Sequence, residues 1–437
     1  MKKNYLLAAM ASGVMLFSAC SNDEAIMNGS DNNAEQTLVL QVASTGDNLT
    51  TRAGRPLLSS EAKQTIDNVK VIICQGTGNG NVKYVKTLTQ WSAEADASSE
   101  PYGGVTGVHG REAIIKLAND DKLATGTYTV YAFGYSDNSD YTDLATKITD
   151  IAKNGDFNEN VTLTLNQIGG NKIGEEIFAG SCALKVVDGK GFYTPVILNR
   201  QVAGTMAYLT DIPCVADGTK LQLVASDRNT NLVLGHFANH DLDGNGTAAD
   251  ANVNYVVNGT TTATENVKVI YEIALSEWFN DPALDADQNG LIDVDNNNWK
   301  GDAAKYAKGS VFAGNFVIPF AKTSGNTFTL QLVDNANNAL KSWKVKLPAS
   351  DKQLSSHTSY IWNSNNTSFT ENATAQDAAE IFNVVRNHLY SIGTRTSDKP
   401  TKPGEGPDDK PESLVNKQEL VLKVNDNWEV IHNMELE

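Results

Sequence analysis

The sequence predicts an all-β protein made of two tandem antiparallel β-sandwich domains. Short runs rich in β-branched and aromatic residues recur along the chain between Gly/Asn/Asp clusters, which is typical of strands and turns. Several runs alternate apolar and polar residues; in 327–332, for example, Phe328, Leu330 and Leu332 share one face. Long helical periodicity is scarce, so the spacing favours sandwiches over βαβ units.

The expected strands follow one another along the whole body of the chain. Each combines β-branched or aromatic residues with turn-forming residues at its ends. They are 69–74, 128–135, 161–165, 221–225, 267–273, 311–320, 327–333 and 340–347.

Composition excludes several classes of protein. The 437 residues suggest about two domains on the usual size range. A formal charge of −17, from 35 basic and 52 acidic residues, opposes binding to nucleic acid. Besides Cys20 the chain has only Cys74, Cys182 and Cys214, with no C-x-x-C pair, so neither a disulfide framework nor a zinc site is indicated.

The N-terminus has the features of a secretion signal. Two lysines precede the apolar run 5–17, which ends in Ser18-Ala19-Cys20 and is too short to span a membrane. The cysteine after Ser-Ala resembles a bacterial lipobox, in which Cys20 is acylated and becomes the new N-terminus. The alternative is an ordinary cleaved signal with an incidental cysteine.

Almost the same short strand occurs near both ends of the chain. Residues 37–42 read TLVLQV and residues 419–424 read ELVLKV. Side chains alternate between the faces of a strand, so the apolar residues of each copy share one face and could fill the same groove. They are Leu38, Leu40 and Val42 in the first copy, and Leu420, Leu422 and Val424 in the second. This similarity predicts strand exchange; the alternative is a chance match of two amphipathic strands.

The expected organisation follows from these segments. Residues 397–412 are rich in Pro, Gly and charge, so they predict a linker that does not pack a core and that tethers the second copy at a distance. The predicted units are a signal peptide (1–19), a propeptide with the removable strand (20–52), two β-sandwich domains (53–188 and 189–396), the linker (397–415) and the donor strand (416–437).

Two acidic loops are candidate structural calcium sites, because alternating oxygen ligands around a glycine turn suit this hard cation. The stronger offers Asp285, Asp287, Asn289 and Asp293, although Asn296 stands where the closing glutamate is expected. The weaker offers Asp241, Asp243, Asn245 and Asp250. The alternative for both is a solvated Asp/Asn/Gly turn.

No catalytic constellation is found, so an enzyme is not expected. The sequence has no H-E-x-x-H, G-x-S-x-G or P-loop motif, and its six histidines are scattered.

Four features together carry a family resemblance: the lipobox leader with its acidic 21–24 tail, Thr51-Arg52-Ala53 after the first strand, the internal signatures 198–203 and 385–390, and the ending ELVLKVNDNWEVIHNMELE. By these features the chain resembles the fimbrillins of Bacteroidales type V pili, with the branch of minor-fimbria shaft subunits nearest. The resemblance implies two transthyretin-like sandwiches and a structural pilin, located at the outer membrane and then in the extracellular fimbrium, that supports cell adhesion.

The resemblance also implies an assembly route and its partners. A trypsin-like protease cuts between Arg52 and Ala53, the first strand is lost, and a neighbour's C-terminal strand enters, giving a head-to-tail homopolymer that meets tip and anchor subunits. Arg55 is the poorer cleavage site because Pro56 follows it. Trp428 and Val430 would extend the donor strand's anchoring.

Two alternative functions are also open for this chain. A surface lipoprotein that binds glycans would use Trp278 and Trp299 as an aromatic platform, and a tip or anchor subunit would share the pilus but not the shaft. The tethered amphipathic strand favours the shaft subunit over both.

Overall fold

The structure is a computed structural model of the 437-residue chain. It describes residues 35–42, 66–76, 80–91, 98–101, 111–165, 175–226, 229–234, 256–257, 259–260, 269–295, 297–320, 325–347, 359–362, 369–372, 380–384, 386, 389–393, 411–415 and 419–425.

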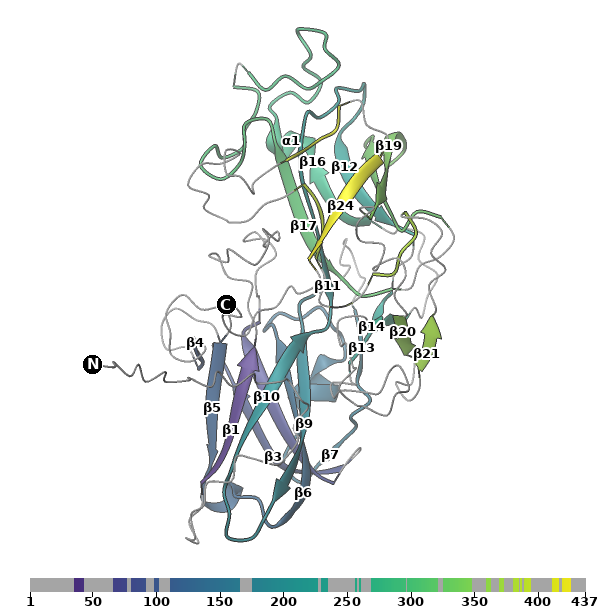
Figure 1. The fold of residues 1–437 in the computed structure, drawn as a ribbon. Coiled ribbons are helices and arrows are strands. Elements are labelled where there is room, and N and C mark those ends of the chain that lie inside the picture. The colour runs from purple at the N-terminus through teal and green to yellow at the C-terminus, as the bar shows by residue number, and fades with distance from the viewer. Residues whose placement is uncertain are drawn as a thin grey trace, which may run out of the picture.

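The first large sheet has nine strands, all from the N-terminal part of the chain (Figure 1). Their order across the sheet is β4-β5-β1-β10-β9-β6-β2-β3-β7. The strands are β1 (Gln36–Val42), β2 (Asn68–Gln75), β3 (Gly80–Leu88), β4 (Glu100–Pro101), β5 (Arg111–Leu117), β6 (Gly126–Tyr135), β7 (Asp156–Phe157), β9 (Phe178–Val186) and β10 (Phe192–Arg200).

The second large sheet also has nine strands, all from the C-terminal part of the chain. Their order is β16-β12-β18-β19-β24-β22-β11-β17, and β23 pairs with β11 off this path. The strands are β11 (Ala203–Thr210), β12 (Lys220–Ala225), β16 (Val269–Ala274), β17 (Val311–Val317), β18 (Phe328–Val333), β19 (Ala339–Lys346), β22 (Leu389–Ile392), β23 (Glu412–Ser413) and β24 (Glu419–Asn425).

Two small sheets and three short helical turns complete the described part of the chain. One small sheet has the order β15-β13-β8 and the other β14-β20-β21. Their strands are β8 (Thr162–Thr164), β13 (Asn231–Val233), β14 (Val256–Val257), β15 (Gly259–Thr260), β20 (Ser359–Trp362) and β21 (Phe369–Asn372). The helical turns are η4 (Asn119–Asp121), η5 (Ala145–Thr149) and α1 (Leu275–Trp278), and no helix among the described residues could cross a membrane.

The all-β prediction is confirmed, and each expected strand overlaps a strand of the structure. The alternation in β18 works as expected, since Phe328, Leu330 and Leu332 are all fully buried. Several strands were not singled out from sequence, among them β9, β10 and β11. The arrangement as two tandem sandwiches stays a prediction.

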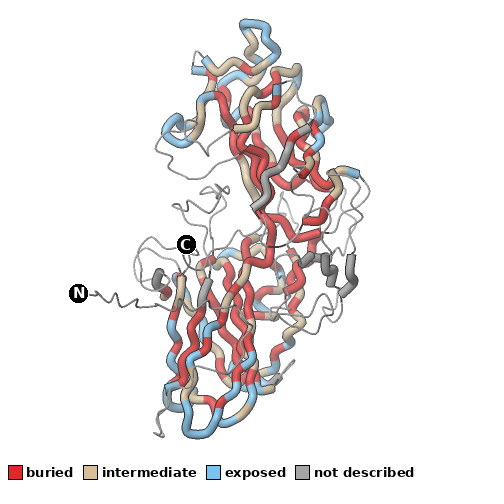
Figure 2. The backbone as a smooth tube through the Cα atoms, in the orientation of Figure 1, coloured by how far each residue is buried: buried red, intermediate tan, exposed pale blue. Residues whose placement is uncertain are grey.

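The buried side chains form three clusters. Buried residues follow one another along the strands of both large sheets (Figure 2). One cluster belongs to the first sheet and one to the second. The third combines both: Phe133 of β6 is in the same cluster as Tyr208 of β11 and Phe312 of β17. The chain changes sheet between Arg200 and Ala203, whereas the boundary expected at 188 lies between β9 and β10 of one sheet.

Candidate functional site

The predicted removable strand is β1, and it lies inside the first sheet. It pairs in parallel with β10 from Gln36↔Phe192 to Val42↔Leu198. On its other edge it pairs antiparallel with β5 from Gln36↔Leu117 to Val42↔Arg111. Leu38 and Leu40 are fully buried in the first-sheet core, as the alternation predicted. Taking β1 away would therefore leave two strand edges and an apolar slot.

Gln36 attaches the start of β1 to the loop before β6, a contact that the sequence analysis did not identify. Its Nε2 donates to the Leu123 carbonyl at 2.9 Å, and its Oε1 accepts from the Leu123 N–H at 2.8 Å. The glutamine is 5% exposed, so both bonds are protected from water. Just before it, Glu35 forms a surface ion pair of 2.6 Å with Lys116 of β5.

The predicted donor strand is β24, and it lies inside the chain's own second sheet. It pairs in parallel with β19 from Lys344↔Glu419 to Lys346↔Val421. It pairs antiparallel with β22 from Leu389↔Asn425 to Ile392↔Leu422. Leu420 is fully buried in the second-sheet core. The expectation of a strand tethered away from the body is therefore wrong for this structure, because β24 pairs with β19 and β22 and its Leu420 is buried within its own chain.

The end of the predicted linker also packs on the body. Glu412–Ser413 forms β23, which pairs with β11, and the Leu414 N–H donates to the Thr210 carbonyl at 3.1 Å. Leu414 is fully buried in the second-sheet core. The linker prediction through 415 is thus too long at its C-terminal end, because the β23–β11 pairing and the buried Leu414 anchor this stretch to the second sheet.

Several predicted site residues lie outside the described residues. They are the lipidation site Cys20, the cleavage bond Arg52–Ala53, the anchors Trp428 and Val430, and the weaker acidic loop with Asp241, Asp243, Asn245 and Asp250. For Val42, Leu422 and Val424 the structure describes the backbone pairing only.

The two internal signatures of the fimbrillin resemblance meet where the chain changes sheet. Arg386 Nη1 donates to Gln201 Oε1 at 2.9 Å, and both residues are buried. The neighbouring Arg200 forms an ion pair with Glu176 at 2.8 Å, with both side chains fully buried, and its guanidinium lies 4.8 Å from the centre of the Phe178 ring. Removal of either partner of such a buried pair destabilises the protein, because the other charge would remain unpaired in an apolar interior.

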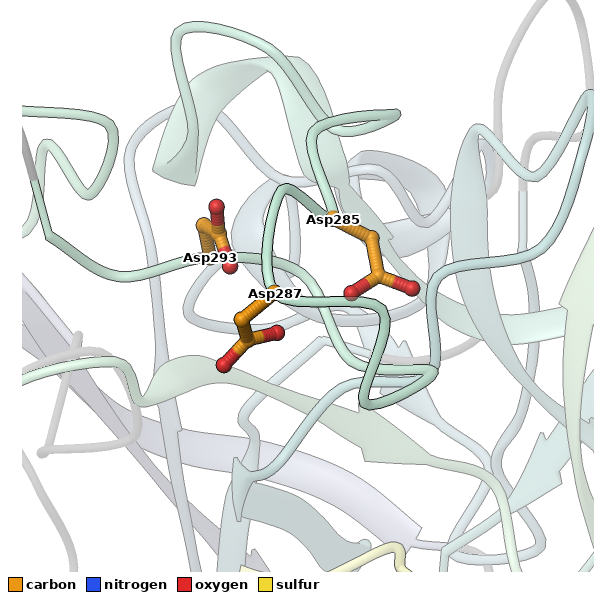
Figure 3. A group of neighbouring side chains, drawn as sticks. All are labelled: Asp285, Asp287 and Asp293. Atoms are coloured by element: carbon orange, nitrogen blue, oxygen red, sulfur yellow. The ribbon is translucent and has the colours of Figure 1, made fainter.

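The stronger acidic loop brings three of its predicted ligands together. One carboxylate oxygen each of Asp285, Asp287 and Asp293 lie within 4.8 Å of one another, and Figure 3 shows the three side chains around the same loop. Asn289 Oδ1 accepts from the Leu291 N–H at 2.8 Å. Such an oxygen-rich turn suits a calcium ion, and this assignment stays a prediction.

Backbone bonds fix the shape of this loop. Asp285 accepts from the N–H groups of Asn289 and Gly290, both at 3.0 Å, and Gly290 has a φ of +82° that glycine adopts without strain. The loop is held to the body because the Cys214 N–H donates to the Gly290 carbonyl at 2.9 Å. Asp295, beside the closing position, forms an ion pair with Lys308.

The two tryptophans proposed as a glycan platform pack against the protein. The Trp299 Nε1–H donates to the Ser310 carbonyl at 2.8 Å, and the ring lies so close to Gly301 that a Cβ there would be 2.2 Å from Cζ2. Trp278 meets Tyr306 edge to face, with ring centroids 4.9 Å apart. Both rings are partly buried, so they contribute to the core and do not form an open platform.

No protein-family model matches the sequence, and no curated protein matches it. Similar solved structures include the fimbrilin of Porphyromonas gingivalis, at 14% identity and a TM-score of 0.34 over 92% of this chain and 100% of that one. The fimbrial anchor protein of P. gingivalis is 10% identical, with a TM-score of 0.32 over 81% and 100% of the two chains. A fimbrial assembly protein from Parabacteroides distasonis is 12% identical, with a TM-score of 0.32 over 83% and 92%. These neighbours are fimbrial proteins from Bacteroidales.

Proposed function

We propose that this chain is a structural pilin, the shaft subunit of a cell-surface fimbria that supports adhesion. It is exported as a lipoprotein acylated at Cys20 and is cut between Arg52 and Ala53 by a trypsin-like protease. The cut releases β1 and the lipid anchor. The β24 strand of a neighbouring copy then enters the vacated groove, and repetition of this step builds a head-to-tail polymer that tip and anchor subunits complete.

One observation carries this proposal: the two similar strands occupy equivalent places in their sheets. Each has a parallel neighbour on one edge and an antiparallel neighbour on the other. When β24 leaves its own sheet and enters the place of β1, it therefore meets one parallel and one antiparallel neighbour, as it did before. Strand addition to an open sheet edge is a general mode of protein recognition.

The groove supplies a driving force once β1 is gone. The β5 and β10 edges would expose unpaired backbone groups, which are a template for another strand. The slot filled by Leu38 and Leu40 lies beside Ile115 and Val196, both buried. Each leucine that refills it contributes about 1.5–3 kcal/mol before the entropy of ordering is subtracted.

The donor strand must leave its own sheet before it can be exchanged. At home, the described residues pair β24 with β19 over Glu419–Val421 and with β22 over Leu422–Asn425. In the groove, the equivalent residues pair with β10 and β5 over the whole length of the strand. Within the described residues, the exchange therefore extends the backbone pairing of the strand, and Leu420, which is buried at home, is buried again in the groove.

Proteolysis of the purified precursor tests this proposal. Treatment with a trypsin-like protease should give a mature N-terminus at Ala53 and a ladder of polymers on a non-reducing gel. Arg52→Gln should abolish both results, whereas Arg55→Gln should change neither, because the bond before Pro56 is a poor substrate. Polymers that form from the uncut Arg52→Gln protein would overturn the proposed route.

A further inference from the structure

We propose that the entering strand binds the groove in one register and one direction, set by Gln418, Glu419 and Lys423 of the donor copy. This inference rests on the strand exchange proposed above and adds the residues that specify it. The occupant is residues 418–424 of a second copy, and the surface is the groove between β5 and β10 together with the Leu123 backbone.

The match between the two strands is longer at its start than the repeated LVL alone. Residues 36–42 read QTLVLQV and residues 418–424 read QELVLKV, so a glutamine precedes each strand at the same spacing. Gln36 uses its side-chain amide to hold both the N–H and the carbonyl of Leu123. Cleavage removes Gln36 and would leave both Leu123 groups without that partner in a buried place. Gln418 carries the same amide to the same position.

The outer face of β5 has a charge pattern that the donor strand complements. Lys116 lies opposite Thr37, and Glu112 lies opposite Gln41, in the antiparallel register of β1 and β5. In the donor strand, Glu419 takes the place of Thr37 and Lys423 takes the place of Gln41. The exchange thus puts an acid opposite Lys116 and a base opposite Glu112, and opposite charges at directly facing positions stabilise a strand pair.

The same charges disfavour the wrong direction. A strand inserted with its direction reversed would put Lys423 opposite Lys116 and Glu419 opposite Glu112, which are like charges. A shift by two residues would remove both matched pairs and would also displace Gln418 from Leu123. The charges and the glutamine therefore select the same register.

Cleavage also removes the residue with which Lys116 forms an ion pair in the uncut chain. In the uncut chain Lys116 forms its 2.6 Å ion pair with Glu35, and this contact lowers the pKa of the Glu35 carboxyl. Glu35 lies in the removable segment, so the cut takes the carboxylate away and Glu419 can supply another. In its own sheet, β24 places Glu419 opposite Lys344 but Lys423 opposite the uncharged Ser391. The groove therefore places an opposite charge across from both Glu419 and Lys423, whereas the donor's own sheet does so for Glu419 alone.

A cross-linking experiment reads the register directly. Ile114 faces Val39 across β5 and β1 and is 57% exposed, so the proposed register puts Val421 of the donor opposite Ile114. The double variant Ile114→Cys/Val421→Cys, made with Cys214→Ser, should give covalent ladders after cleavage and mild oxidation, and ladders should be absent from the uncut protein. Among the native thiols, burial raises the pKa of Cys74 to about 11, so its background reactivity is low.

The control for register is Ile114→Cys/Lys423→Cys, which has the same chemistry displaced by two residues. It should give fibres without covalent ladders. Efficient cross-linking through position 423, together with failure through position 421, would overturn the proposed register.

A charge exchange tests the specificity. Lys116→Glu and Glu419→Lys should each raise the subunit concentration needed for half-maximal assembly by about two- to five-fold. The double variant should restore wild-type assembly, which a merely structural effect of either change would not do. Absence of rescue would remove the charge pairing from this inference.

The two glutamines provide a matched pair of variants. Gln418→Ala should weaken fibres about ten-fold or more, because the Leu123 groups stay unsatisfied in the polymer, and should leave the uncut precursor's first sheet unchanged. Gln36→Ala should do the reverse: it weakens the precursor and leaves fibres of cleaved protein unchanged. Equal effects of both variants on the fibres would contradict the role of Gln418. If none of these variants changes assembly while Leu422→Asp abolishes it, this inference fails and strand exchange stands; fibres formed by Leu422→Asp would overturn strand exchange itself.

Discussion

The strands β1 and β24 have nearly the same residues but are held differently. Both neighbours pair with β1 along its whole length, and Gln36 adds a buried side-chain attachment at its start. By contrast, in the described part of the chain β19 pairs with the first part of β24 and β22 with the last part. The difference shows that how firmly a strand is held depends on its neighbouring strands as much as on its own residues. A strand paired along both edges has more backbone hydrogen bonds that must break before it can leave the sheet.

The largest expected effect comes from Leu422→Asp. A carboxylate on the apolar face of the donor costs several kcal/mol in an apolar groove. The cleaved variant should form no fibres, as measured by sedimentation and electron microscopy. Because β24 also belongs to the chain's own second sheet, the variant should melt at a lower temperature, and deletion of residues after Glu412 should do the same through loss of Leu414 and Leu420.

A mixing experiment separates lost donation from lost folding. Leu422 lies in the second sheet, so the groove of the first sheet should form normally in the cleaved variant, which should still accept a wild-type donor strand and end the fibre there. Mixed with wild-type subunits, it should therefore shorten the fibres in proportion to its fraction. Wild-type fibre lengths in such mixtures would show that its groove is not functional.

The second effect concerns the place where the chain changes from the first sheet to the second. Glu176→Gln leaves Arg200 buried without its carboxylate, so the free energy of unfolding should fall by about 3–5 kcal/mol. The decrease should be the same in cut and uncut protein, because neither residue belongs to β1 or β24. Asp121→Asn, which removes an exposed ion pair with Lys153 at 2.9 Å, is the matched control and should cost at most about 1 kcal/mol. Denaturant unfolding measures both.

The third prediction tests whether the donor strand and the removable strand follow the same backbone path into the groove. Gly191 lies so close to the residue before β1 that an added Cβ would be 2.0 Å from the Glu35 carbonyl oxygen. Gly191→Ala should destabilise the precursor by about 1–3 kcal/mol and weaken the fibres comparably. Gly126→Ala adds a Cβ with ordinary contacts to Tyr128 and is the control. A weakened precursor with unaffected fibres would show that the donor strand starts differently.

The smallest effect concerns the acidic loop beside the second sheet. If calcium binds, it offsets the mutual repulsion of Asp285, Asp287 and Asp293, and its removal by a chelator should lower the melting temperature by about 2–4 °C. Asp285→Ala with Asp287→Ala should abolish this sensitivity. Asp334→Ala, in a turn fixed by the Asn338 amide, should lower the melting temperature equally with and without chelator. Identical melting curves of the wild type in both conditions would leave an ordinary acidic turn.

Much of the fold was predictable because the residue pattern of a strand, the alternation of its apolar and polar side chains, is local in the sequence. The alternation that put Phe328, Leu330 and Leu332 on one face survives as three fully buried side chains. The loop around Asp285 was predictable for the same reason, because its ligands and its glycine are close in sequence. The Gln36–Leu123 and Gln201–Arg386 contacts were not, because each joins residues far apart in the chain and a glutamine by itself predicts no partner.

The residues alone determined the strands, their apolar faces and the likeness of β1 to β24, because side-chain alternation is a property of neighbouring residues. Only the tertiary structure decided where β24 lies. A strand's slot depends on which edges are open and on which core it completes, and the edges of β19 and β22 are set by residues distant in sequence. The likeness of the two strands predicts that they can exchange places, and the sheets around them decide which place each one occupies.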